Sequence, residues 1–85
     1  MAYKYIIEKA PAKFLETVPK KQRDKILLEI ESLVANPRKY GVIKLQGRDP
    51  AEYRTRIGDY RIVFMIEDEI FIIKVIRIFS RGDGY

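Results

Sequence analysis

The spacing of apolar residues changes halfway along the chain, and this change limits the fold more than any other feature. Residues 20–34 carry Ile, Leu and Val three or four positions apart, as one buried face of a helix requires. Asn36-Pro37 ends this pattern, because the residue before a proline avoids helical geometry. Three runs of β-type residues follow, at 52–57, 60–67 and 70–79. We therefore expect helices first and a sheet second.

The first half also contains a first strand and a shorter helix. Tyr3–Ile7 is aromatic and β-branched, which favours a strand that lies at an edge or pairs late. Pro11 suits the start of a helix, and Pro19 interrupts that helix before the longer one begins at Lys20. Two helices joined by so tight a break are predicted to form an antiparallel helical hairpin.

The second half predicts a meander of strands. Residues 42–45 are a short strand candidate, and Gly58-Asp59 and Asp68-Glu69 are the expected hairpin turns, the first being the better turn pair. The fold class is α+β, with an N-terminal strand and a helical hairpin packed on one face of a mostly antiparallel, twisted sheet. A chain of 85 residues supports one small core, so residues 1–85 are expected to form a single domain.

The composition excludes several kinds of chemistry. Cys and His are both absent, which removes disulfides, thiolate zinc sites and every His-based acid–base pair or metal site. We expect neither a metal nor another cofactor, and an enzyme of this composition must work with carboxylates, Tyr, Ser, Thr, Lys and Arg. No apolar run approaches the ~20 residues that a membrane span needs, and Met1–Lys4 does not open a signal peptide. A soluble, cytoplasmic protein is expected, with no membrane partner.

The positive charge differs in kind between the two halves. The net charge is +5, and residues 1–43 hold seven Lys and two Arg, whereas residues 44–85 hold two Lys and six Arg. A guanidinium group presents a planar fork of donors that matches phosphate oxygens. The sheet is therefore the expected binding site for a phosphate-bearing polyanion or an acidic protein partner.

Three arginines are predicted to share the open, solvent-exposed face of the sheet. With Gly58-Asp59 as a two-residue turn, Arg56 lies opposite Arg61. Side-chain alternation then places Arg54, Arg56 and Arg61 together on the face away from the helices. Like charges opposite each other destabilise a strand pair. A bound anion is one reason for such a cluster, and a solvated surface with Glu52 or Asp59 as partners is the other.

Three blocks of sequence and the final residue carry a resemblance to a known family. The blocks are Leu45–Gly47, Tyr53–Phe64 and Val75–Arg81, and the final residue is Tyr85. They resemble the RelE/ParE toxin superfamily of bacterial type II toxin–antitoxin systems, on its RelE-like mRNA interferase branch. The most specific part is the middle block, with basic residues around a Gly-Asp-Tyr-Arg corner. The resemblance spans nearly the whole chain and implies the RelE-like fold of microbial ribonuclease type.

The resemblance also implies an activity and its residues. RelE-like toxins cleave mRNA in the ribosomal A site, where the 2′-hydroxyl of the RNA attacks the adjacent phosphate without a metal. The family's catalytic roles fall on Arg61, Arg81 and Tyr85, and its substrate-binding roles on Arg54 and Arg56. The implied partners are the ribosome, mRNA and a small antitoxin with an acidic binding segment, and the toxin–antitoxin complex is expected on operator DNA.

The sequence departs from the family at one position. Ser80 stands where many relatives have His or Lys, so a proton donor or acceptor found in them is missing, and no His is present to activate Ser80 as a nucleophile. Strand parity predicts Ser80 on the arginine side of the sheet and Arg81 off it, unless a bulge or the end of the strand turns Arg81 back.

Three other functions remain open at this point. A ParE-like toxin shares the fold but poisons DNA gyrase and cleaves nothing. A non-catalytic module would bind RNA or the ribosome through its arginines, with Tyr85 stacking on a base or forming only a tail. A degenerate toxin would retain only antitoxin binding and, in the complex, operator DNA.

Overall fold

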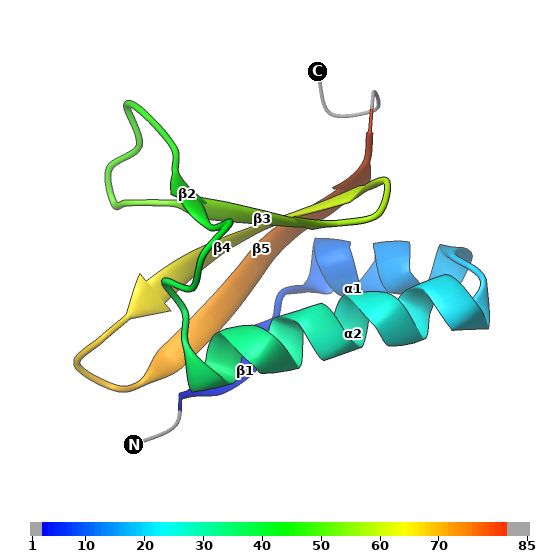
Figure 1. The fold of residues 1–85 in the computed structure, drawn as a ribbon, viewed down its shortest axis with the longest axis horizontal. Coiled ribbons are helices and arrows are strands. Elements are labelled where there is room, and N and C mark those ends of the chain that lie inside the picture. The colour runs from blue at the N-terminus through cyan, green and yellow to red at the C-terminus, as the bar shows by residue number, and fades with distance from the viewer. Residues whose placement is uncertain (1–2, 82–85) are drawn as a thin grey trace.

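The computed structural model describes residues 3–81 and shows two helices covering one face of a five-stranded sheet (Figure 1). The elements follow one another as β1 (Lys4–Ile7), α1 (Lys9–Thr17), α2 (Lys20–Ala35), β2 (Ile43–Lys44), β3 (Tyr53–Ile57), β4 (Tyr60–Glu67) and β5 (Ile72–Ser80). The α+β class with an N-terminal strand is confirmed.

The sheet has the strand order β1-β5-β4-β3-β2. β1 pairs with β5 in parallel, and the other neighbours are antiparallel. The expected edge position of the first strand and the mostly antiparallel sheet are therefore confirmed. A parallel pair needs a long connection, and α1, α2 and the strands β2 to β4 lie between β1 and β5 in the chain.

The helix boundaries follow local backbone chemistry. α1 begins two residues before Pro11, which the first turn tolerates because the N–H that proline lacks would have no helical partner there. Pro19 has an extended backbone, with ψ at 147°, and its carbonyl accepts the first α2 bond from the Arg23 N–H at 2.9 Å. α2 ends at Ala35, as the Asn36-Pro37 signal predicts. None of the helices within residues 3–81 is long and apolar enough to cross a membrane.

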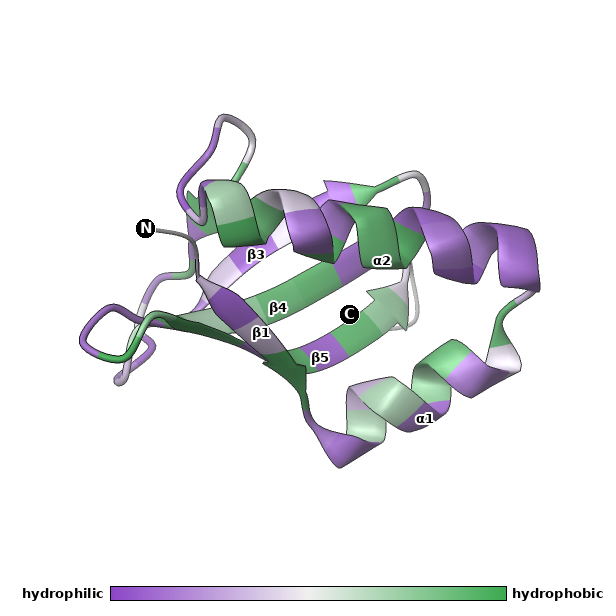
Figure 2. Ribbon diagram, turned by 90° about the horizontal axis from the view of Figure 1, so that it is seen from below, coloured by the Kyte–Doolittle hydropathy of each residue, from purple (hydrophilic) through white to green (hydrophobic). Residues whose placement is uncertain are grey.

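The core lies between the helices and the helix-facing side of the sheet (Figure 2). α2 contributes Ile26, Ile30 and Leu33, all fully buried. The strands contribute Ile62, Phe64, Ile73, Val75 and Ile78. The apolar stripe predicted for the long helix is thus the part of α2 that faces the sheet.

The second hairpin differs from the prediction. β5 starts at Ile72, so residues 68–71 form a four-residue connection in place of an Asp68-Glu69 turn. Phe71 has a φ of 56°, and its ring packs edge-on against Tyr3 with centroids 5.4 Å apart. The Phe71 carbonyl accepts a hydrogen bond from the Lys4 N–H at 2.8 Å. The turn is longer because its last residue is held by the start of β1, a segment far away in sequence.

A β-bulge in β5 changes which face its last residues occupy. Val63 pairs with Arg77 and Phe64 with Val75, so Ile76 has no partner in the register. Side chains beyond the bulge exchange faces relative to strict alternation. Ser80 pairs with Tyr60, which lies on the helix side of the sheet. The parity prediction for Ser80 is therefore wrong, and the bulge is the reason.

Candidate functional site

The β3–β4 hairpin places the three predicted arginines as the sequence indicates. The Gly58-Asp59 turn joins Ile57 to Tyr60, and Arg56 pairs with Arg61. Gly58 has a φ of 57°, which glycine adopts without the strain that a side chain would add. The predicted register is confirmed, and it brings the three arginines together on the face away from the helices.

Arg61 is buried, although the sequence predicts an exposed side chain. Its relative accessible surface is 8%, and its Nη1 donates a long hydrogen bond of 3.4 Å to the Tyr60 carbonyl. Within residues 3–81, no carboxylate lies within ion-pair distance of it. A buried charge is costly unless an opposite charge or several hydrogen bonds compensate for it. Arg61 therefore has unused capacity to bind an anion.

A fourth arginine and an apolar floor complete this side of the sheet. The bulge brings Arg77 opposite Val63, and its guanidinium carbon lies 4.5 Å from the centroid of the Phe79 ring. Val63 and Phe79 are themselves buried. We call the surface formed by Arg54, Arg56, Arg61 and Arg77 the arginine face. The sequence analysis missed Arg77, because its position depends on a bulge that has no clear local signal.

Ser80 and Arg81 lie at the end of β5, beside the β3–β4 turn. The Arg81 N–H donates a hydrogen bond to the Asp59 carbonyl, which holds the end of β5 against the β3–β4 turn. Ser80 and Arg81 line a hollow of about 670 Å³ with Pro19 from the α1–α2 connection and Gln22 from the first turn of α2. The structure therefore does not bring Arg81 into one groove with Arg54 and Arg56. Tyr85 lies outside the described residues.

A groove at the edge of β3 adjoins the arginine face. It has a volume of about 700 Å³ and lies between β3 and the connection from α2 to β2. Its lining consists of residues 38–43 and 54–56, so Arg54 and Arg56 belong to both surfaces. We call this hollow the edge groove. The sequence analysis missed the contribution of residues 38–40, which it assigned to no element, since they lie between the helix end at Asn36-Pro37 and the short strand candidate at 42–45.

A largely buried carboxylate anchors both walls of the edge groove. Thr55 Oγ1 donates a hydrogen bond of 2.7 Å to Glu29 Oε2, and Lys39 Nζ forms an ion pair of 2.9 Å with the same oxygen. The Glu29 side chain is only 12% exposed. One carboxylate of α2 thus ties β3 to the α2–β2 connection.

Glu29→Ala should lower the free energy of unfolding by about 1–3 kcal/mol, because it leaves the buried Thr55 hydroxyl and Lys39 without their partner. Glu29→Gln should lose less, since its amide oxygen still accepts from Thr55. Urea denaturation of both variants measures the difference. Equal losses in the two would contradict the assigned hydrogen bond.

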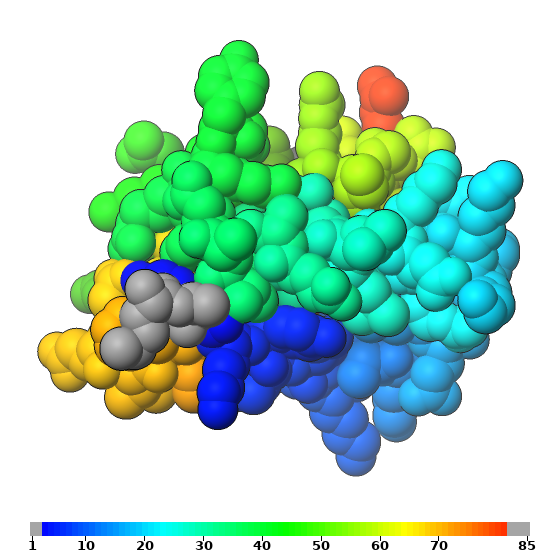
Figure 3. All heavy atoms as spheres, turned by 60° about the horizontal axis from the view of Figure 1, so that its bottom comes forward, coloured from blue at the N-terminus to red at the C-terminus, as the bar shows by residue number. Residues whose placement is uncertain are grey.

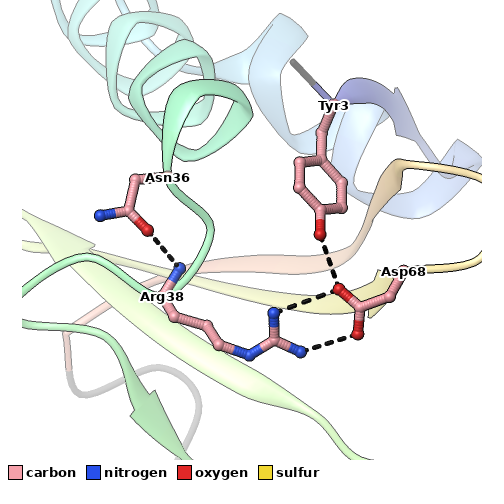
Figure 4. A network of polar contacts seen from close by, with 4 residues as sticks. All are labelled: Tyr3, Asn36, Arg38 and Asp68. Atoms are coloured by element: carbon pink, nitrogen blue, oxygen red, sulfur yellow. Dashed lines mark hydrogen bonds and ion pairs between the residues drawn. The ribbon is translucent and has the colours of Figure 1, made fainter. Parts of the chain in front are cut away.

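A second ion pair fixes the same connection from the other side (Figure 4). Arg38 donates two hydrogen bonds to Asp68, at 3.1 and 2.9 Å, and Tyr3 donates one of 2.6 Å to the same carboxylate. The Arg38 N–H also bonds to Asn36 Oδ1 at 3.2 Å. The hydrogen bonds from Arg38 contribute most, and that from Tyr3 contributes next, to lowering the pKa of the Asp68 carboxyl to about 2. The hydrogen bond to Asp68 raises the pKa of the Tyr3 hydroxyl.

Asp68 should make stability depend on pH in the acid range. Because its folded pKa of about 2 lies below the usual value near 3.9, its contribution is present above about pH 4 and is lost as the pH falls toward 2. Urea midpoints of the wild type and Asp68→Asn, measured from pH 5 down to pH 2, should therefore converge. Parallel curves would show that the ion pair contributes nothing in solution.

Comparison with solved structures first defines the class of fold. One chain in the crystal structure of an archaeal RelE-RelB complex from Pyrococcus horikoshii matches with a TM-score of 0.82 and 32% identity, covering 98% of this chain and 99% of that one. The isolated RelE toxin of E. coli matches with a TM-score of 0.82 at 22% identity, covering 95% and 86%, respectively. The fold is that of RelE toxins.

Comparison of sequences then identifies the family. Residues 3–85 match the family described as "ParE toxin of type II toxin-antitoxin system, parDE". A Methanocaldococcus jannaschii protein named "Putative toxin RelE1" is 34% identical over 89 residues, which cover 99% of this chain and 94% of that protein. The chain belongs to the RelE/ParE superfamily of toxins from type II toxin–antitoxin systems.

Proposed function

We propose that residues 1–85 act as a single toxin domain, a ribosome-dependent endoribonuclease that cleaves mRNA in the A site and so inhibits translation. The observation that carries the proposal is the buried Arg61, which lies opposite Arg56 and has no carboxylate partner within residues 3–81. A phosphate would supply the missing negative charge. The family membership supports the same reaction.

The proposed chemistry is transfer of a phosphoryl group within the RNA. The 2′-oxygen bonds to the adjacent phosphorus as its proton leaves, and the bond from phosphorus to the 5′-oxygen breaks as that oxygen gains a proton. The products are a 2′,3′-cyclic phosphate and a 5′-hydroxyl. Negative charge grows on the non-bridging oxygens during the step, and a preorganised guanidinium group stabilises it without reorganising at that moment.

The residues divide between binding and chemistry. Arg54 and Arg56 bind the RNA phosphates, and Arg61 stabilises the reacting phosphate. Arg81, whose N–H is bonded to Asp59 in the β3–β4 turn, is assigned a catalytic role from the family pattern, as is Tyr85 outside the described residues. With Ser80 in place of a His or Lys, Tyr85 is the proposed proton-transfer group.

The proposed partner is a small antitoxin. Matching chains occur in structures of RelE with RelB from Pyrococcus horikoshii and of RelBE2 from Mycobacterium tuberculosis. A net charge of +5 favours an acidic binding segment in such a partner. We place the toxin in the cytoplasm, where ribosomes are, and its complex with the antitoxin on operator DNA.

Primer extension tests the reaction directly. mRNA recovered from a translation reaction to which the chain has been added should carry cuts phased to codons, with 2′,3′-cyclic phosphate ends. The same mRNA without ribosomes should be cut far less. Brisk cleavage of free RNA would make the chain an independent ribonuclease and contradict ribosome dependence.

The family description favours one second candidate, a ParE-like toxin that inhibits gyrase without cleaving RNA. Growth inhibition without any cuts in mRNA, together with loss of gyrase supercoiling activity, would establish that function. Growth inhibition with neither effect would favour a non-catalytic module that binds RNA or the ribosome.

A further inference from the structure

Tyr40 is an aromatic residue that the folded chain leaves fully uncovered. Its relative accessible surface is 103%, and it stands in the lining of the edge groove. Exposed tyrosines are ordinary at protein surfaces, but this one lies among cationic neighbours, since Arg38, Arg54 and Arg56 line the same groove. Neither the sequence motifs nor the proposed reaction assigns it a role.

The backbone that carries Tyr40 is held on both sides. The Val42 N–H donates a hydrogen bond of 3.1 Å to the Lys39 carbonyl, which closes a turn with Tyr40 and Gly41 at its corners. Gly41 has a φ of 97°, a conformation that favours glycine. Lys39 is tied to Glu29 by the ion pair at 2.9 Å. The turn is therefore a fixed support, which lowers the entropic cost of binding to the ring.

The edge groove lies at one rim of the molecule, and two segments of the chain supply its lining. Figure 3 shows the α2–β2 connection, in green, and the β3–β4 segment, in yellow-green, standing along the same edge with a hollow between them. Arg38 is held at this rim by its two bonds to Asp68. Phosphates need cations and nucleobases need an aromatic face, and this rim offers both within one groove.

We propose that the edge groove binds single-stranded RNA, with one base stacked on Tyr40 and the adjoining phosphates on Arg54 and Arg56. The inference rests on the proposed function and deepens it, because it adds a subsite beside the reacting phosphate at Arg61. An acidic peptide fits less well, since its carboxylates would use the guanidinium groups and leave the ring uncovered. Duplex RNA does not fit, because its bases are already stacked.

Binding of an uncleavable RNA tests the subsite without ribosomes. The probe is a fluorescent 2′-O-methyl oligonucleotide of mixed sequence and about eight nucleotides, within the usual site sizes for single strands. Anisotropy titrations should show Tyr40→Ala binding it about 5- to 150-fold more weakly, the loss expected from one stacked base. Tyr40→Phe retains the ring and should bind within about twofold of the wild type.

Two controls separate base stacking from other effects. An abasic oligonucleotide of the same length should bind the wild type and Tyr40→Ala equally, because it offers phosphates but no bases. Tyr5→Ala removes another exposed tyrosine, on β1 at the opposite edge of the sheet, and should leave RNA binding unchanged. Equal thermal midpoints for all variants would show that each one folds.

Several results would overturn the inference. One is an unchanged affinity of Tyr40→Ala for the RNA, and another is an equal loss of affinity with the abasic probe. A third is that Tyr40→Ala weakens the binding of a glutamate-rich peptide and leaves RNA binding unchanged. The last is that the wild type binds the RNA no more tightly than the Kd of roughly 10⁻⁴ M that weak nonspecific contacts give. Tyr40-dependent binding without cuts on ribosomes would contradict only the proposed reaction. Cuts with Tyr40-independent binding would contradict only the subsite.

Discussion

Replacing Arg61 with alanine should reduce ribosome-dependent cleavage by about 10²–10³-fold, the usual loss when one preorganised donor to a developing oxyanion is removed. Arg61→Lys should recover only part of the rate, because an ammonium group keeps the charge but loses the planar fork that holds two phosphate oxygens. Primer extension over a time course with ribosomes measures the three rates, and growth of cells expressing each variant should follow the same order.

The burial of Arg61 requires a control for folding. At 8% exposure, its side chain is part of the packing of the sheet, so alanine removes buried methylene groups together with the charge. The thermal midpoint of each variant must therefore be measured. Arg61→Lys keeps most of the buried methylene groups and so preserves most of this packing. Arg48→Ala is a matched control, since it removes an exposed arginine that pairs with Glu52 outside the arginine face. Full cleavage by a folded Arg61→Ala would refute the proposed role.

Phe64→Ala should lower the free energy of unfolding by about 3–5 kcal/mol, because it removes a fully buried ring and leaves a cavity. Phe64 lies on β4 at the centre of the sheet, and its ring stacks on Tyr53 with centroids 5.9 Å apart. Small domains have total stabilities of roughly 5–15 kcal/mol, so the variant should be partly unfolded near 37 °C. Urea denaturation followed by circular dichroism measures the change.

Leu28→Ala is the control for that loss. Leu28 lies on α2 but is 64% exposed, so its truncation should change the free energy of unfolding by less than about 0.5 kcal/mol. The comparison separates burial from the mere loss of an apolar side chain. A loss in Phe64→Ala no larger than that in Leu28→Ala would contradict the position of the core.

Most elements were predictable because their signals are local. The period of α2 and its end at Asn36-Pro37 are properties of neighbouring residues, and so is the Gly58-Asp59 turn that pairs Arg56 with Arg61. A two-residue turn and side-chain alternation are enough to place three arginines on one face. The family assignment depends on the same short blocks.

The features that escaped prediction depend on contacts between distant segments. The four-residue turn before β5 is held by Tyr3 and Lys4, more than sixty residues away, as the 65-residue separation of Tyr3 and Asp68 shows. The bulge at Ile76 moved Ser80 off its predicted face and brought Arg77 to the arginine face. Neither the longer turn nor the bulge has a recognisable signal in the residues that form it.

The amino-acid sequence by itself determined the order of helices and strands, the arginine cluster of the β3–β4 hairpin and the family, because each depends on short-range spacing and residue type. Only the tertiary structure decided that Arg61 is buried without a carboxylate partner in residues 3–81, and that the residue 38–43 connection forms a groove with β3. Burial and grooves arise where separate elements pack together. The spacing of residues within one segment does not determine how its side chains pack against those of another segment.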